Sequence, residues 1–126
     1  MDNENKNVVE DGVTEDSTTS EKVNRIDFNY RGKHYCLEYS REALVRMESA
    51  GYNPSEAGER PMLELTQLWA GAFYKNHRNE SSKTIERILN EIPNQDELLD
   101  SLREMVAATY ETLRNGEGNL KWTASA

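Results

Sequence analysis

A change in hydrophobic period near residue 40 most constrains the fold of this 126-residue chain. Before it, apolar and polar residues alternate along two short runs, 26–30 and 35–39, on either side of Arg31 and Gly32. Alternation with period two is typical of half-buried strands, and a short glycine-containing turn between two such runs predicts a β-hairpin. A lone hairpin is only marginally stable in water, so its apolar face must pack on helices.

After the hairpin, apolar residues recur at intervals of three and four, the spacing of amphipathic helices. Ser40 is suited to cap the first helix, and Gly51 is suited to end it. Residues 52–60, which contain proline and glycine, are expected to form a loop.

The second helix should begin at Pro61, because proline suits the first turn, and should fade near His77. Its apolar stripe consists of Met62, Leu65, Leu68, Trp69, Ala72 and Phe73. Gly71 interrupts this stripe. Glycine inside a helix costs about 1 kcal/mol relative to alanine, so we expect Gly71 to permit the close approach of another element.

Two further helices follow. Ser81 or Ser82 is expected to cap the third helix, and Pro93 should end it. Asn94, with Glu97 three residues later, resembles a capping box at the start of the fourth helix. That helix should stop at the pair of residues 115–116, asparagine and glycine.

The C-terminal residues 119–123 place Leu120 and Trp122 at strand spacing. They are expected either to add a third strand to the hairpin or to tuck against the helices. The patterns together predict a single mostly helical α+β domain over residues 24–126. It consists of an N-terminal β-hairpin packed on about four helices, with the option of a short C-terminal strand.

Acidic charge is concentrated at the N-terminus. The net charge is −8, and residues 1–23 carry seven acidic residues and two lysines, a net −5. This segment has no aromatic residue and cannot bury enough surface to offset its ordering entropy, so it is predicted to be a disordered acidic leader. It would serve as a solubilising tail or as an electrostatic arm. An acidic chain is not expected to bind nucleic acid, and no run approaches the roughly 18 apolar residues of a membrane span.

Residues that carry chemistry are few. The chain has two histidines, His34 and His77, and one cysteine, Cys36, and none of them has the spacing of a zinc site. His34 and Cys36 share a strand face, but such a pair is a poor sign of a catalytic thiol. We therefore expect no catalytic residues, no cofactor and no metal. A single cysteine suits a reducing cytoplasm.

Aromatic residues indicate a different kind of site. Trp69 and Phe73 are expected in the core, or alternatively in a partner-binding groove. Together with Tyr74 and Trp122 they are the candidate partner-binding residues. Apolar surface exposed on a small helical body would mark a protein–protein site.

Five sequence blocks occur in order between residues 25 and 122. They are Tyr30-Arg31-Gly32-Lys33-His34-Tyr35, Arg46-Met47-Glu48-Ser49-Ala50-Gly51-Tyr52, Leu68-Trp69-Ala70-Gly71-Ala72-Phe73, the helical set Leu99, Leu102 and Met105, and Gly118-Asn119-Leu120-Lys121-Trp122. In these blocks the chain resembles a family of small proteins of tailed bacteriophages and prophages that are regarded as tail assembly chaperones. It departs from the family pattern at Trp69, where the family has phenylalanine, and at Val106, where it has tyrosine.

This resemblance implies a non-enzymatic protein that binds the phage tape-measure protein, keeps its apolar helices from aggregating and assists tail-tube assembly. It also implies a place in the cytoplasm of the bacterial host and absence from the mature virion. The alternative is a small acidic phage effector that binds and inhibits a host protein, with the acidic leader imitating nucleic acid. An enzyme is the third alternative, which the poor inventory of reactive residues disfavours.

Overall fold

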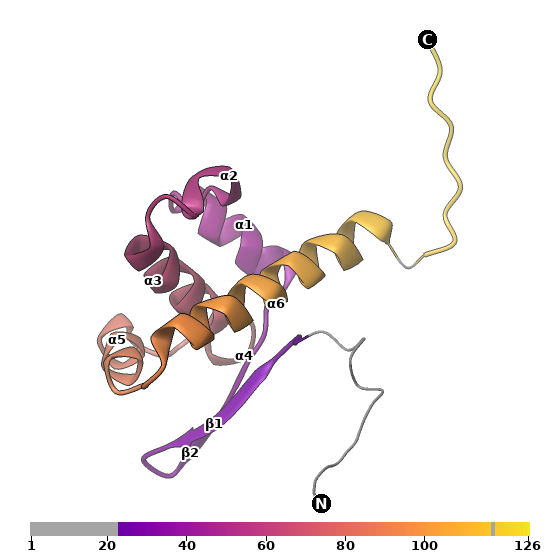
Figure 1. Ribbon diagram of the computed structural model, residues 1–126. Helices are drawn as coiled ribbons and strands as arrows, with labels where there is room; N and C mark the ends of the chain where they lie inside the picture. The colour runs from indigo at the N-terminus through magenta and orange to yellow at the C-terminus, as the bar shows by residue number, and fades with distance from the viewer. Residues whose placement is uncertain (1–22, 117) are drawn as a thin grey trace, which may run out of the picture.

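The computed structural model describes residues 23–116 and 118–126. In this part of the chain an antiparallel hairpin precedes six helical segments (Figure 1). The strands are β1 (Ile26–Tyr30) and β2 (Lys33–Leu37), and the helices are α1 (Arg41–Ser49), α2 (Pro54–Ala57), α3 (Pro61–Ala72), α4 (Tyr74–His77), α5 (Ser82–Asn90) and α6 (Gln95–Asn115). The predicted fold class, mostly helical with an N-terminal hairpin packed against the helices, is confirmed.

The hairpin turn consists of Arg31 and Gly32, whose φ angles are 51° and 82°. Two consecutive positive φ angles are those of a type I′ turn, and its twist matches that of the strands it joins. The turn sets a register in which Phe28 lies opposite Tyr35. Their rings stack with centroids 5.1 Å apart, so the two strands present one aromatic face to the helices.

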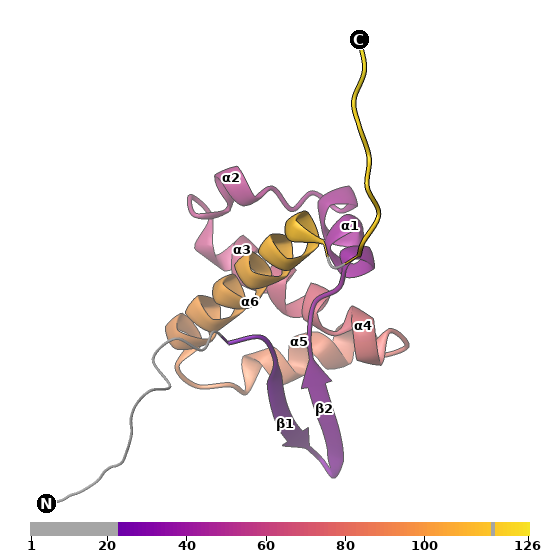
Figure 2. The same cartoon turned by 90° about the vertical axis from the view of Figure 1, so that its right-hand side faces the viewer.

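The core is built around α3, on which α1, α5 and α6 all pack. Figure 2 shows α6 crossing the body, with the hairpin below it. Leu68 and Trp69 of α3 are fully buried, and the indole N–H of Trp69 donates to the carbonyl oxygen of Ile85 at 2.9 Å. The predicted stripe is wrong at its first residue: Met62 is 74% exposed, because it lies on the solvent side of the first turn of α3, whereas Glu64 of the same turn is buried.

Several predicted helix ends are confirmed. The side chain of Ser40 caps α1, and that of Ser81 caps α5 by accepting from the backbone of Thr84 at 3.2 Å. Gly51 follows α1 with a φ of 109°, a conformation that glycine adopts at no steric cost. Beyond Ala72 the chain continues to His77 as the separate four-residue helix α4.

Two local predictions are wrong. The predicted loop 52–60 contains the short helix α2, which the side chain of Asn53 caps. Asn94 does not form a capping box: its φ is 57° and its side chain makes no cap bond, because this left-handed residue turns the chain from α5 into α6. The side chain of Gln95 instead donates to the carbonyl oxygens of Leu89 and Ile92, at 2.7 and 3.2 Å. It thereby supplies hydrogen-bond donors to backbone carbonyl groups at and just beyond the C-terminal end of α5.

The chain ends behave differently from the expectation. Residues 118–126 form no strand and extend away from the body in both ribbon views, so neither docking prediction for this segment holds (Figures 1 and 2). At the other end, Val23, the residue before Asn24, packs against the core. The disordered acidic leader is predicted over residues 1–23, of which 1–22 lie outside the described residues.

Within the described ranges, no helix combines the length and the apolar character needed to cross a membrane.

Candidate functional site

A groove of about 670 Å³ lies between α1, α3 and α4, and we call it the α1–α3–α4 groove. Its lining is mainly apolar and rich in short side chains. These apolar lining residues are Ala43, Met47, Ala50, Ala70, Gly71, Phe73 and Ile85. Of these short side chains, those of Ala50 and Ala70 are exposed and so are open to a docking partner.

Gly71 is the position that lets α1 approach α3. A Cβ atom placed on Gly71 would lie 2.3 Å from the sulfur of Met47, far inside normal contact distance. The predicted close approach at Gly71 is therefore confirmed, and the neighbouring element is α1.

The rim of the groove carries Tyr74 between two arginines. The guanidinium carbons of Arg46 and Arg78 lie 4.5 and 4.8 Å from the centre of its ring, which are cation–π distances. The hydroxyl of Tyr74 donates to a carboxylate oxygen of Glu42 at 3.2 Å. These contacts hold an aromatic ring and two positive charges beside an apolar floor, in a chain whose net charge is −8.

The four candidate partner-binding residues are not brought together. Trp69 and Phe73 are each only 1% exposed and belong to the core, where their rings make an edge-on contact at 5.2 Å. Phe73 and Tyr74 both line the groove, and Tyr74 alone of the two is partly exposed. Trp122 lies outside the groove, in the C-terminal segment.

A second groove, of about 680 Å³, lies between the β2–α1 connection and α6. Its lining is more polar, with Arg25, Glu38, Arg41 and Lys75 among its residues. Since such groups are well hydrated, this second groove offers less to an apolar partner than the α1–α3–α4 groove does.

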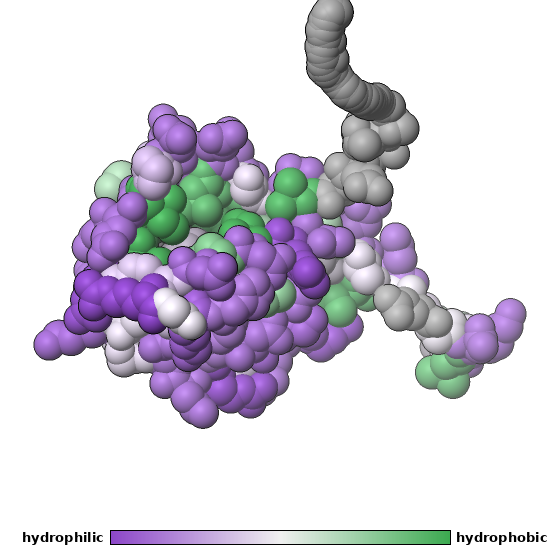
Figure 3. Space-filling model, turned by 90° about the horizontal axis from the view of Figure 1, so that it is seen from below, coloured by the Kyte–Doolittle hydropathy of each residue, from purple (hydrophilic) through white to green (hydrophobic). Residues whose placement is uncertain are grey.

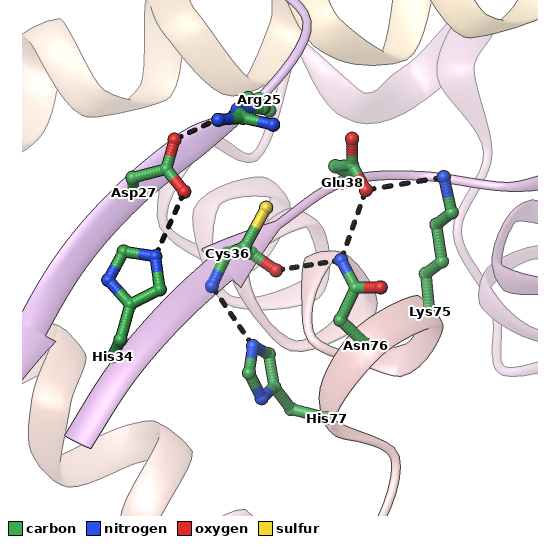
Figure 4. A network of polar contacts seen from close by, with 8 residues as sticks. All are labelled: Arg25, Asp27, His34, Cys36, Glu38, Lys75, Asn76 and His77. Atoms are coloured by element: carbon green, nitrogen blue, oxygen red, sulfur yellow. Dashed lines mark hydrogen bonds and ion pairs between the residues drawn. The ribbon is translucent and has the colours of Figure 1, made fainter.

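A polar network covers the outer edge of β2 (Figure 4). The backbone N–H of Cys36 donates to Nε2 of His77 at 3.0 Å, and the carbonyl oxygen of Cys36 accepts from the side chain of Asn76 at 3.0 Å. Asn76 also donates to Glu38, which forms an ion pair with Lys75 at 3.2 Å. Asn76 and His77 of α4 thus satisfy the backbone edge of β2, and the ion pair of Lys75 with Glu38 helps to fix α4 against the hairpin.

Cys36 is not an activated nucleophile in this network. Burial and a hydrogen bond to Asp27 raise the pKa of its thiol, whereas a reactive cysteine needs a lowered pKa. Asp27 is already engaged, with Nε of Arg25 at 2.9 Å and a ring nitrogen of His34 at 3.3 Å. Burial, reinforced by the charge of Lys33, lowers the pKa of His77, whose Nε2 accepts from the backbone and so cannot serve the thiol as a base.

No group of three or more His, Cys, Asp or Glu side chains is placed to hold a metal ion among residues 23–116 and 118–126.

A family model described as a domain of unknown function, DUF5055, matches residues 19–126. The chain belongs to this family. The match takes in both strands, all six helical segments and the C-terminal segment, and the description names no phage. Searches of curated proteins and of solved structures find no match.

One feature of this DUF5055 domain escapes the sequence patterns. Glu64 is only 5% exposed, and its carboxylate accepts two hydrogen bonds from Arg103, at 2.9 and 2.6 Å. The pair ties α3 to the middle of α6. Its only signal in the sequence is that Glu64 stands four residues before Leu68, on the buried side of α3.

Proposed function

We propose that the protein is a non-enzymatic phage tail assembly chaperone, which binds the tape-measure protein and assists tail-tube assembly. The observation that carries this proposal is the apolar floor of the α1–α3–α4 groove. Such a groove accepts the apolar face of an amphipathic helix, a common mode of peptide recognition. Support also comes from the five sequence blocks that resemble the tail assembly chaperones.

The groove suits reversible binding. It is open to solvent and its exposed floor includes Ala50 and Ala70, so it offers contact area without a deep, closed pocket. Tyr74 supplies an aromatic anchor on the rim, and anchors of this kind contribute most to binding. Arg46 and Arg78 beside it favour a helix that carries acidic residues next to its apolar face.

The proposal is tested by co-expression with the tape-measure protein encoded in the same phage genome. Ala70→Glu places a charge on the exposed groove floor and should lower the amount of tape-measure protein that stays in solution and co-purifies. Ala107→Glu is the matched control, because Ala107 is an exposed alanine on α6, away from the groove. Thermal melting of both variants checks that each is folded. Equal recovery with both variants would rule out the groove as the binding site.

The cellular place follows from the same proposal. The protein would act in the cytoplasm of the bacterial host and be absent from the mature virion, which mass spectrometry of purified particles tests. Its presence there in stoichiometric amounts would contradict a chaperone role.

The alternative, an acidic phage effector that inhibits a host protein, depends on the acidic leader 1–23, of which residues 1–22 lie outside the described part of the chain. Gene position separates the two functions. A gene between those of the major tail protein and the tape-measure protein favours the chaperone.

A further inference from the structure

The outer edge of β1 has no partner strand in the described part of the chain. Tyr30 and Lys33 flank the two-residue turn, so they form a hydrogen-bonded pair, and such pairs alternate along an antiparallel ladder. The backbone groups of Asp27 and Asn29 therefore point away from β2. On β2, the backbone N–H and C=O of Cys36 point outward by the same alternation, and both are hydrogen-bonded to side chains of α4.

The two edges of the hairpin thus differ. Figure 2 shows α4 beside β2, whereas β1 is the outer strand on the opposite side. An edge strand with free N–H and C=O groups is a template for an added strand, and added strands are a common mode of peptide recognition.

An apolar hollow lies next to this free edge. The hydroxyl of Tyr30, at the end of β1, donates to Glu91 at the α5–α6 junction at 2.8 Å. The backbone N–H of Val23, three residues before β1, donates to Glu104 in the middle of α6 at 3.0 Å, so β1 runs alongside the first half of α6 toward the junction. Seen from below, the face that carries the hairpin is hollowed, and hydrophobic residues gather there (Figure 3). The partly buried apolar residues of β1 and of the α5–α6 junction are Ile26, Phe28, Ile92 and Leu98.

The C-terminal tail (residues 118–126) has the pattern of the missing strand. Leu120 and Trp122 are 88% and 81% exposed, the two highest values among the exposed large hydrophobic residues described. Residues two apart share one face of a strand, so both side chains would enter the same hollow. Lys121 would then face the opposite side, which in β1 carries Asp27.

Leu120 cannot reach the outer edge of β1 at Asp27 in its own chain. Gly116 lies twelve residues beyond Glu104, which is about 18 Å along the helix axis. β1 starts near Glu104 and runs from there toward Glu91, away from the tail (Figure 1). The four residues from Gly116 to Leu120 span at most about 14 Å, so Leu120 stops short of Asp27.

We infer that the tail of one copy of this chain adds a strand to the outer edge of β1 in a second copy. Leu120 and Trp122 fill the hollow between β1 and the α5–α6 junction, and the tail backbone bonds to Asp27 and Asn29. Reciprocal exchange of two tails gives a closed dimer with twofold symmetry. This association does not depend on the chaperone proposal, because it uses a different face from the α1–α3–α4 groove.

The first test is the oligomeric state of the full chain, measured by sedimentation equilibrium over a range of concentrations. We expect a monomer–dimer equilibrium that the double substitution Leu120→Ser and Trp122→Ser shifts to monomer. The matched control is Asn119→Ser with Thr123→Ser, which changes the other face of the tail and should leave the dimer intact. A wild-type chain that stays monomeric at millimolar concentration overturns the inference.

The second test locates the tail. A labelled peptide of residues 118–126 is titrated into the full chain that carries Leu120→Ser and Trp122→Ser, and backbone amide shifts are followed by NMR. We expect the shifts to centre on Asp27 and Asn29. A peptide with Trp122→Ser should bind more weakly, with a dissociation constant raised by about tenfold or more. Absence of binding, or shifts confined to Met47 and Gly71 in the α1–α3–α4 groove, overturns the inference.

Discussion

Replacing Gly71 by alanine tests whether α1 and α3 are packed to their limit where they meet. The new Cβ atom would lie 2.3 Å from Sδ and 2.6 Å from Cγ of Met47, a buried side chain. Non-bonded heavy atoms in good contact are about 3.5–4.0 Å apart, so Met47 has to move by about 1 Å or more. Because Cγ lies close to the backbone, rotation of the terminal methyl group alone cannot relieve the overlap.

Two effects of opposite sign decide the outcome. Alanine is favoured over glycine in a helix interior by about 1 kcal/mol. Overpacking a buried contact costs about 1–3 kcal/mol, and the involvement of Cγ places this site in the upper half of that range. We expect a net loss of about 1–2 kcal/mol in the free energy of unfolding, which lowers the melting temperature by about 4–8 °C for each kcal/mol in a domain of this size.

Urea denaturation followed by circular dichroism measures the effect. Gly58→Ala is the matched control, because nothing lies within 4 Å of its Cβ position and its φ of −63° suits alanine. That variant should be neutral or slightly stabilised. In a Met47→Ala background the obstructing side chain is gone, so Gly71→Ala should become stabilising. Stabilisation by Gly71→Ala in the wild-type chain would show that Met47 moves into the groove at no cost, and the packing argument would be wrong.

Other predictions concern charge, metal and the N-terminus. Arg103→Met leaves the buried carboxylate of Glu64 without its two donors and should cost about 1–2 kcal/mol in urea denaturation, whereas Arg114→Met, an exposed control on the same helix, should cost almost nothing. The lowered pKa of His77 means that the unfolded chain binds its proton more readily, so stability should fall as pH drops below about 6.5, and His77→Gln should flatten that decline. Treatment with a chelator should leave the melting temperature unchanged, and a clear drop would reveal a structural metal. A chain that begins at Val23 should melt within a few degrees of the full chain; a larger loss would show that the acidic leader contributes to folding.

Features that depend on neighbours in the sequence could be predicted. The hairpin follows from two alternating runs around Arg31 and Gly32, and the ends of α1 and α5 follow from Ser40 and Ser81. These signals act over three or four residues, through a local hydrogen bond or a backbone conformation, so no tertiary contact is needed to recognise them.

Features that depend on the packing of distant segments could not be predicted. Met62 fits the apolar stripe of α3 by spacing, but it lies on the solvent side of the first turn, whose other side, at Glu64, is covered by α6. Asn94 has the right neighbours for a capping box, yet the direction in which α6 leaves α5 demands a left-handed residue at that position. Glu64 appears exposed by residue type, and only the placement of Arg103 on α6 makes its burial acceptable.

The candidate site likewise combines features that could be predicted from the sequence with features that could not. Gly71 was recognisable because a glycine inside a strong helix needs a reason, but the sequence could not show that Met47 is the neighbour or that a groove opens beside it. The aromatic residues pointed to apolar surface without showing which of them is buried. Burial is decided by the arrangement of the helices around α3, and that arrangement places Trp69 inside and leaves Tyr74 on a rim.

The C-terminal tail makes the limit of sequence reasoning most explicit. Alternation at Leu120 and Trp122 indicates a strand, and an alternating segment has the same appearance whether its partner strand is in the same chain or in another. What separates the two cases is reach, because α6 carries Gly116 about 18 Å beyond Glu104, which bonds to Val23 just before β1, and Leu120 is only four residues further on. The length of one helix therefore turns an intramolecular strand into an intermolecular one. Inserting four glycine and serine residues after Gly116 would add about 14 Å of reach, let Leu120 meet its own hairpin, and should convert the dimer to a monomer.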